Sequence, residues 1–131
     1  MKICRVGFAV FFFTAFGNMA SALSSERDAE EMNAIARTSG CYLCHNVEPR
    51  KPAVQEILPY GPAWTDIAKK YKTDANAAVK LTQIIRQGSG KTRAERHWQG
   101  KTSVAGMQPN SVEITEADAG KLASWILSLG K

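Results

Sequence analysis

Cys41-Tyr42-Leu43-Cys44-His45 is the most informative stretch of this 131-residue chain. Two cysteines two residues apart, followed directly by a histidine, form the attachment motif of a c-type haem in exported proteins. The spacing lets one tight turn present both thiols to one edge of the flat macrocycle, and it leaves the imidazole beside the iron. The motif therefore predicts one haem c, bound covalently through Cys41 and Cys44, with His45 as an iron ligand.

Two cysteines and a histidine also suit other chemistry. In an oxidising compartment the simplest alternative is a Cys41–Cys44 disulfide in a haem-free helical domain. A structural zinc ion needs four ligands, and the fourth soft candidate would be His97. A thioredoxin-like motif needs a preceding strand and a βαβ setting, and the sequence shows neither. Haem attachment is the favoured interpretation, with the disulfide and the zinc site as its alternatives.

Residues 1–22 have the composition of a secretory signal peptide. Its parts are a positive start at Lys2 and Arg5, an apolar run over residues 6–17 and a small-residue cleavage site at Ala20-Ser21-Ala22. The run is shorter than the roughly 20 apolar residues of a membrane span. We expect cleavage before Leu23, one domain over residues 23–131 with no stable membrane insertion, and a periplasmic location. An uncleaved signal anchor is the alternative.

Charge is unevenly distributed in this chain, whose formal net charge is +5. Residues 50–101 contain eleven basic and four acidic side chains, whereas acidic residues dominate residues 23–40. Such an asymmetry raises the encounter rate with an acidic partner surface, although single lysines usually just solvate a helix face. We expect no nucleic-acid partner, because no basic motif is interleaved with aromatic residues.

Four stretches have the apolar periodicity of amphipathic helices: residues 24–39, 61–71, 75–87 and 115–129. Their apolar stripes contain Met32, Ile35 and Ala36; Trp64, Ile67, Ala68 and Tyr71; Ala77 or Ala78 with Leu81, Ile84 and Ile85; and Leu122, Trp125, Ile126 and Leu129. The sequence therefore predicts an all-α fold of four to five short helices. These side chains make a modest core, which a buried porphyrin would complete.

Local signals predict where these helices begin. Ser25 with Asp28 predicts a cap for the first helix, and Thr115 with Asp118 predicts a capping box for the last. Thr73 or Asp74 is expected to cap the third helix, and Gly61-Pro62 is expected to begin the second with the proline in its first turn.

Two long loops join these helices. The loop over residues 46–60 contains Val54, Ile57 and Leu58, which are expected to fold inward as a short apolar turn. The loop over residues 88–110 is longer than structureless loops usually are in compact domains, so we expect it to cover the far face of the haem. Gly120 inside the last helix is expected to permit close approach of another helix.

The sixth iron position has few candidate ligands in this sequence. Met32 lies on the first helix, on the core side of the attachment turn, and cannot easily reach the far face. Met107 lies in the loop just before the last helix, and a thioether there would favour reduced iron and raise the reduction potential. We therefore predict His45 and Met107 as the two axial ligands, with His97 as the alternative to Met107.

Trp98 is a second candidate haem contact, in the long loop over residues 88–106. Its indole N–H can donate a hydrogen bond to a haem propionate while its ring covers the macrocycle edge. An ordinary aromatic core residue is an equally good interpretation of the same position.

Four motifs occur in a fixed order along the chain. They are Cys41-x-x-Cys44-His45, Gly61-Pro62-Ala63-Trp64, Met107-x-Pro109-Asn110 and Leu122-Ala123-Ser124-Trp125-Ile126-Leu127. In this order they resemble the small soluble bacterial monohaem class I cytochromes c, over nearly all of residues 23–131. The resemblance implies the class I cytochrome c fold, in which the first and last helices cross near the haem.

The same resemblance implies a role for Pro62, whose backbone carbonyl would accept a hydrogen bond from the imidazole of His45 and increase its basicity. Two features depart from the family pattern. Both long loops exceed those of the smallest members, and Gly106 stands where the family often has a proline before the ligand methionine.

In function, the resemblance implies an electron-transport protein and not an enzyme. We expect a periplasmic one-electron shuttle that exchanges electrons with redox proteins bearing an acidic docking surface. The chain would act as a monomer or as a subunit of a redox complex, such as that of a periplasmic molybdenum dehydrogenase. The alternative is a haem-based enzyme or gas sensor with an open or displaceable sixth iron site.

Overall fold

The computed structural model describes residues 18–50, 57–92, 96, 98–104 and 106–130. In chain order the elements are α1 (Asn18–Thr38), the 3-10 turn η1 (Cys41–Leu43), α2 (Trp64–Tyr71), α3 (Ala77–Gln87) and α4 (Glu116–Ser128). Within those residues the only β-pairing is an isolated bridge between Gln99 and Thr102. The predicted all-α architecture is confirmed, and across the described ranges no helix is long and apolar enough to cross a membrane.

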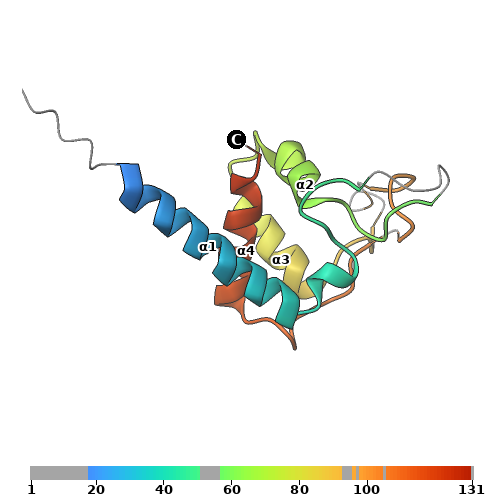
Figure 1. Ribbon diagram of the computed structural model, residues 1–131. Helices are drawn as coiled ribbons and strands as arrows, with labels where there is room; N and C mark the ends of the chain where they lie inside the picture. The colour runs from blue at the N-terminus through green and yellow to red at the C-terminus, as the bar shows by residue number, and fades with distance from the viewer. Residues whose placement is uncertain (1–17, 51–56, 93–95, 97, 105, 131) are drawn as a thin grey trace, which may run out of the picture.

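Helix α4 is the centre of the molecule, because it packs against α1, α2 and α3. In Figure 1, α1 runs across α4 and its N-terminal end projects beyond the rest of the fold. Ala36 of α1 and Ala119 and Ala123 of α4 are fully buried. Small side chains of this kind allow two helices to approach closely. The predicted crossing of the first and last helices is confirmed.

The core combines residues from all four helices with parts of the attachment turn. Its buried apolar members are Met32, Ala36, Cys41, Trp64, Ile67, Leu81, Ile85, Ile114, Ala119, Leu122, Ala123 and Ile126. Trp64 and Leu122 are its largest fully buried side chains. The predicted apolar stripes thus face inward, and Ile35, Tyr71, Ile84, Trp125 and Leu129 pack at the edge of this core.

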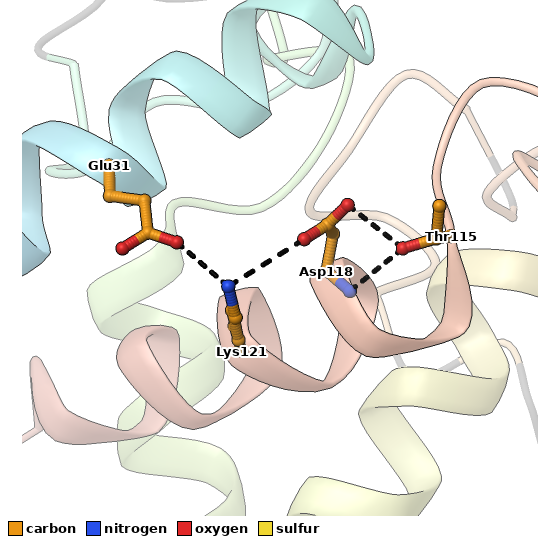
Figure 2. Close-up of polar contacts among 4 residues, drawn as sticks. All are labelled: Glu31, Thr115, Asp118 and Lys121. Atoms are coloured by element: carbon orange, nitrogen blue, oxygen red, sulfur yellow. Dashed lines mark hydrogen bonds and ion pairs between the residues drawn. The ribbon is translucent and has the colours of Figure 1, made fainter.

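Thr115 is the N-cap residue of α4, as the predicted capping box requires. Its Oγ1 accepts a hydrogen bond from the backbone N–H of Asp118 at 3.1 Å and lies 2.8 Å from the Asp118 carboxylate. Figure 2 shows that Asp118 also faces Lys121, whose Nζ donates to Glu31 of α1 at 2.8 Å. One polar group therefore links the start of α4 to the middle of α1.

Three helix starts differ from the sequence prediction. Helix α1 begins at Asn18, so Ser25 lies inside it and not at its cap, since no glycine or proline interrupts residues 18–38. Helix α2 begins at Trp64, two residues after Pro62. Helix α3 begins at Ala77, and the Asp74 side chain accepts a hydrogen bond from the backbone N–H of Asn76 just before it.

Two packing predictions are wrong. Ile57 and Leu58 do not fold inward but are 69% and 45% exposed, and Val54 lies outside the described residues. A Cβ on Gly120 would meet only Thr82 Oγ1, at an ordinary 3.9 Å. The close approach occurs instead at Gly130, where a Cβ would lie 2.9 Å from the Ala68 Cβ of α2.

Candidate haem site

A cavity of about 580 Å³ lies beside η1, between α2, α3 and the two long loops. Its volume falls within the range of about 300–1,000 Å³ that is usual for ligand pockets. Among its lining residues are all six predicted site residues: Cys41, Cys44, His45, Pro62, Trp98 and Met107. Ile67, Leu81 and Ile84 supply apolar wall from α2 and α3.

The attachment motif forms one tight turn at the end of α1. Gly40 has a positive φ of 71°, a conformation that glycine adopts without steric cost, and it breaks the chain away from α1. The backbone N–H of Cys44 and that of His45 then both donate to the carbonyl of Cys41, at 3.2 and 3.0 Å. The turn presents both cysteines to the same cavity, as the motif spacing predicts.

Cys41 and Cys44 are not joined by a disulfide in the structure. Cys41 is buried and Cys44 is exposed. The described residues contain no group of three or more His, Cys, Asp or Glu side chains that could hold a metal ion. The zinc interpretation therefore has no supporting geometry in that part of the chain, and His97 lies outside it.

His45 is 9% exposed, and its ring is held from one side by a backbone carbonyl. Nδ1 lies 2.8 Å from the carbonyl oxygen of Pro62, so Nδ1–H donates and the lone pair of Nε2 remains available for a metal. Burial lowers the pKa of His45, against a smaller raising effect of the Pro62 hydrogen bond. A neutral imidazole is the form that ligates iron.

Gly61 determines how closely this chain segment approaches His45. Its N–H donates to the carbonyl of Cys44 at 2.9 Å, and a Cβ at this position would lie 2.8 Å from His45 Cε1. Only glycine fits, because any side chain would push the imidazole away from Pro62. Sequence reasoning assigned no such role to Gly61, and its place directly before Pro62 was the available signal.

An aromatic cluster supports the side of His45 that faces the core. The Trp64 ring is stacked on the imidazole with centroids 6.3 Å apart. Tyr42 and Trp125 pack against Trp64 with centroid distances of 5.0 and 5.5 Å. The apolar stripe of the second helix indicated that Trp64 is buried, but not that it contacts His45.

Met107 lines the cavity, is half-buried, and has its backbone hydrogen-bonded to Ser89 on both sides. Met32 is 5% exposed and belongs to the helical core. It is not among the residues that line the cavity. Of the two methionines that the sequence offered as ligands, Met107 alone therefore meets the positional requirement.

Trp98 lines the cavity near two cationic side chains. The Nζ atoms of Lys70 and Lys101 lie 5.9 and 6.0 Å from the centroid of its ring. Both distances lie at the outer limit of a cation–π contact, which is about 6 Å. Trp98 therefore lies where a positive charge from α2 and a positive charge from the second long loop come close together.

Two hydrogen bonds between distant segments hold the walls of the cavity together. The backbone N–H of Ser103 donates to the carbonyl of Pro59 at 2.8 Å, which joins the two long loops. Asn110 Nδ2 donates to the carbonyl of Ser39 at 2.9 Å, which joins the Met107 segment to the end of α1.

The cavity suits a c-type haem in shape and in donor chemistry. Its wall is largely apolar, as a porphyrin face requires, and two thiols and one neutral imidazole come from a single turn. Met107 brings a thioether from another segment to the same cavity.

Comparison with known proteins agrees with this geometry. The protein-family model described as cytochrome c matches residues 18–130. The chain belongs to the cytochrome c family. As a family member it carries one c-type haem, covalently bound through Cys41 and Cys44, and it functions in electron transport.

Individual relatives are bacterial cytochromes of similar size. This cytochrome is 36% identical to cytochrome c-552 of Nitrosomonas europaea, over 84% of this chain and 89% of that relative. It is 33% identical to cytochrome c-551 of Allochromatium vinosum, over 88% of this chain and 99% of that relative. The predicted family is therefore confirmed.

Solved structures show the same fold. The crystal structure of wild-type Nitrosomonas europaea cytochrome c552 superposes with a TM-score of 0.56 at 34% identity, covering 74% of this chain and 98% of that one. The class 1 cytochrome MtoD of Sideroxydans lithotrophicus ES-1 gives the same TM-score at 23% identity, covering 79% and 98%. The class I cytochrome c fold is thus confirmed for this cytochrome.

Proposed function

We propose that this cytochrome is a periplasmic one-electron carrier whose haem iron is ligated by His45 and Met107. The observation that carries the proposal is that an imidazole anchored on Pro62 and a thioether line the same haem-sized cavity. A haem bound there supplies the Fe(II)/Fe(III) couple. Because both axial positions are filled, the iron has no open site for a substrate, and we infer that the protein is not an enzyme.

The chain's own residues have distinct roles in this proposal. Pro62 orients the imidazole of His45 and strengthens it as a ligand. The buried Trp64 ring restricts movement of the same imidazole. Trp98, which lines the cavity beside Lys70 and Lys101, would donate its indole N–H to a haem propionate.

The partner is proposed to be a redox protein with an acidic docking surface. Lys70 and Lys101 are exposed, and both contact Trp98 on the cavity wall. Positive charge near the haem steers an acidic surface toward the shortest path for the electron. A periplasmic dehydrogenase, such as a molybdenum enzyme, fits this description, with the cytochrome as a free monomer or as a subunit.

Cleavage before Leu23 is part of the proposal for the periplasm. It would remove residues 18–22 of α1 and leave the core residues of that helix in place. Mass spectrometry of the exported protein measures the N-terminus and the mass of one attached haem together. A chain that begins at Met1 would contradict the cleavage, and a chain without haem mass would contradict covalent attachment.

The absorption spectrum of the Met107→Ala variant tests the axial ligand. Ferric wild-type protein should show the weak long-wavelength band of iron–thioether coordination, and Met107→Ala should lose it. Met32→Leu is the matched control, because it removes a buried thioether while conserving volume, and its spectrum should match the wild type. An unchanged Met107→Ala spectrum would exclude Met107 as ligand.

Carbon monoxide separates the carrier from the alternative function. Reduced wild-type protein should bind carbon monoxide poorly, because Met107 fills the sixth position, and Met107→Ala should bind it readily. Rapid binding by the wild type would favour a haem-based enzyme or gas sensor with a displaceable ligand.

A further inference from the structure

The C-terminal end of α3 and the residues that follow it pair with the segment that contains Met107. The carbonyl of Arg86 accepts a hydrogen bond from the backbone N–H of Asn110 at 3.2 Å, and the N–H of Ser89 donates to the carbonyl of Met107 at 2.8 Å. From Arg86 to Ser89 the first segment advances by three residues, while its partner goes back by three, from Asn110 to Met107. The two segments are therefore antiparallel along one side of the haem cavity.

Ser89 holds Met107 with its side chain as well as with its backbone. Its Oγ accepts a hydrogen bond from the N–H of Met107 at 3.1 Å. Both backbone polar groups of Met107 are thus bonded to one residue, and both residues line the cavity. Among the described residues, only Ser89 hydrogen-bonds to both the N–H and the carbonyl of Met107.

Glycines on both sides let these segments touch. Gly88 has a φ of +77°, and a Cβ there would lie 2.5 Å from the Met107 carbonyl oxygen. A Cβ on Gly106 would overlap the Ser89 carbonyl oxygen and lie 2.8 Å from Gly90 Cα. The backbones are therefore in direct contact, and Met107 cannot slide along this wall.

We propose that Ser89 is a positioning residue for the sixth iron ligand. By fixing the Met107 backbone, it keeps the thioether directed into the cavity and disfavours conformations in which an exogenous ligand replaces it. This inference rests on the proposed function, because it requires Met107 to be an iron ligand. It assigns the stability of that bond to a residue that does not touch the iron.

Titration of the ferric holoprotein with imidazole tests the proposal, because imidazole competes with Met107 for the iron. Ser89→Ala should bind imidazole about three- to tenfold more tightly than wild type, the equivalent of one lost net hydrogen bond. Ser89→Thr retains the hydroxyl and should bind imidazole as the wild type does. Equal affinities of Ser89→Ala and wild type would overturn the proposal.

Ser103→Ala is the matched control variant. Its hydroxyl lies 3.3 Å from the carbonyl oxygen of Pro59 and is not hydrogen-bonded to Met107. The backbone N–H of Ser103 bonds the same carbonyl, so the loop stays tied without the hydroxyl. Imidazole affinity should therefore be unchanged. A gain equal to that of Ser89→Ala would mean general loosening of the loops and would overturn the proposal.

A double-mutant cycle distinguishes positioning from a general structural effect. If Ser89 acts through Met107, then Ser89→Ala should not change imidazole affinity when it is added to Met107→Ala. The same fold-change in both backgrounds would overturn the inference. If Met107→Ala alone leaves the spectrum and the affinity unchanged, the proposed axial ligand is wrong and the inference falls with it.

Hydrogen exchange gives a measurement that needs no variant, should Ser89→Ala fail to take up haem. In the structure the Met107 amide is hydrogen-bonded to Ser89, whereas Gln108 is exposed, and the test uses the wild-type holoprotein. The Met107 amide should therefore exchange at least about tenfold more slowly than that of Gln108. Equal exchange rates would contradict the contact on which the proposal rests.

Discussion

At the scale of single residues, the haem site depends on a backbone carbonyl that His45 can reach only because the neighbouring residue has no side chain. The carbonyl of Pro62 binds the imidazole of His45, and Gly61 makes that approach sterically possible. All six predicted site residues line one cavity. Five of them could be predicted because they belong to short, chemically specific motifs, and Trp98 is the exception. Gly61 and Ser89 were missed, because their roles depend on contacts with residues far along the chain.

Replacement of Gly61 by alanine is expected to displace the His45 ring. The new methyl group would lie 2.8 Å from Cε1, and overpacking of this kind usually costs about 1–3 kcal/mol. The Gly61→Ala holoprotein should therefore melt at a lower temperature and show an altered reduction potential, as measured by calorimetry and voltammetry.

Gly120→Ala is the control for that change. A Cβ on Gly120 meets only Thr82 Oγ1 at 3.9 Å, and alanine favours helix by roughly 0.5–1 kcal/mol over glycine. Its melting temperature should stay the same or rise, and its potential should not change. Equal behaviour of the two variants would contradict the role assigned to Gly61.

At the scale of elements, local signals located the helices well and the loop contacts poorly. The cap of α4 was predictable because Thr115 and Asp118 lie within one turn of each other. The start of α2 was not, because Pro62 lies outside the helix and its carbonyl is used for His45. The antiparallel pairing of residues 86–90 with 106–110 has no periodicity, so no sequence pattern predicts it.

Loss of the α4 cap is expected to destabilise the whole molecule, since α4 packs against every other α-helix. Thr115→Ala removes the side-chain oxygen that accepts from Asp118 N–H, and such caps contribute about 0.5–2 kcal/mol. Thr115→Ser retains the hydroxyl and should restore most of the loss. Denaturant unfolding measures both variants, and an equal midpoint for Thr115→Ala and wild type would contradict the prediction.

At the scale of the whole molecule, charge is separated between two regions. Acidic residues of α1, including Glu26, Asp28 and Glu30, are exposed on the helix that projects in Figure 1. Cationic side chains accompany Trp98 at the haem cavity. The sequence predicted the charge asymmetry, but the structure was needed to place Lys70 and Lys101 beside the same ring.

Removal of two charges at the cavity should slow electron transfer to an anionic partner. The double variant Lys70→Gln and Lys101→Gln should react several-fold more slowly with ferricyanide at low salt, and the difference should shrink as ionic strength rises. Stopped-flow oxidation of the reduced protein measures both effects. Lys121→Gln, on α4 next to Glu31, is the control, and it should slow the reaction less per charge removed than the double variant does. A flat salt response would contradict steering.

The pairing of α1 with α4 has a consequence for how the molecule forms. Glu31 and Lys121 are hydrogen-bonded across a sequence separation of 90 residues. Closing so large a loop costs conformational entropy before the contact contributes any stability. A chain that lacks α4 would leave Met32, Trp64 and Leu81 without the helix against which their elements pack. The core therefore cannot close until α4, which begins at residue 116 of 131, is present, and a haem attached at residues 41–45 must wait for its protein surroundings to form.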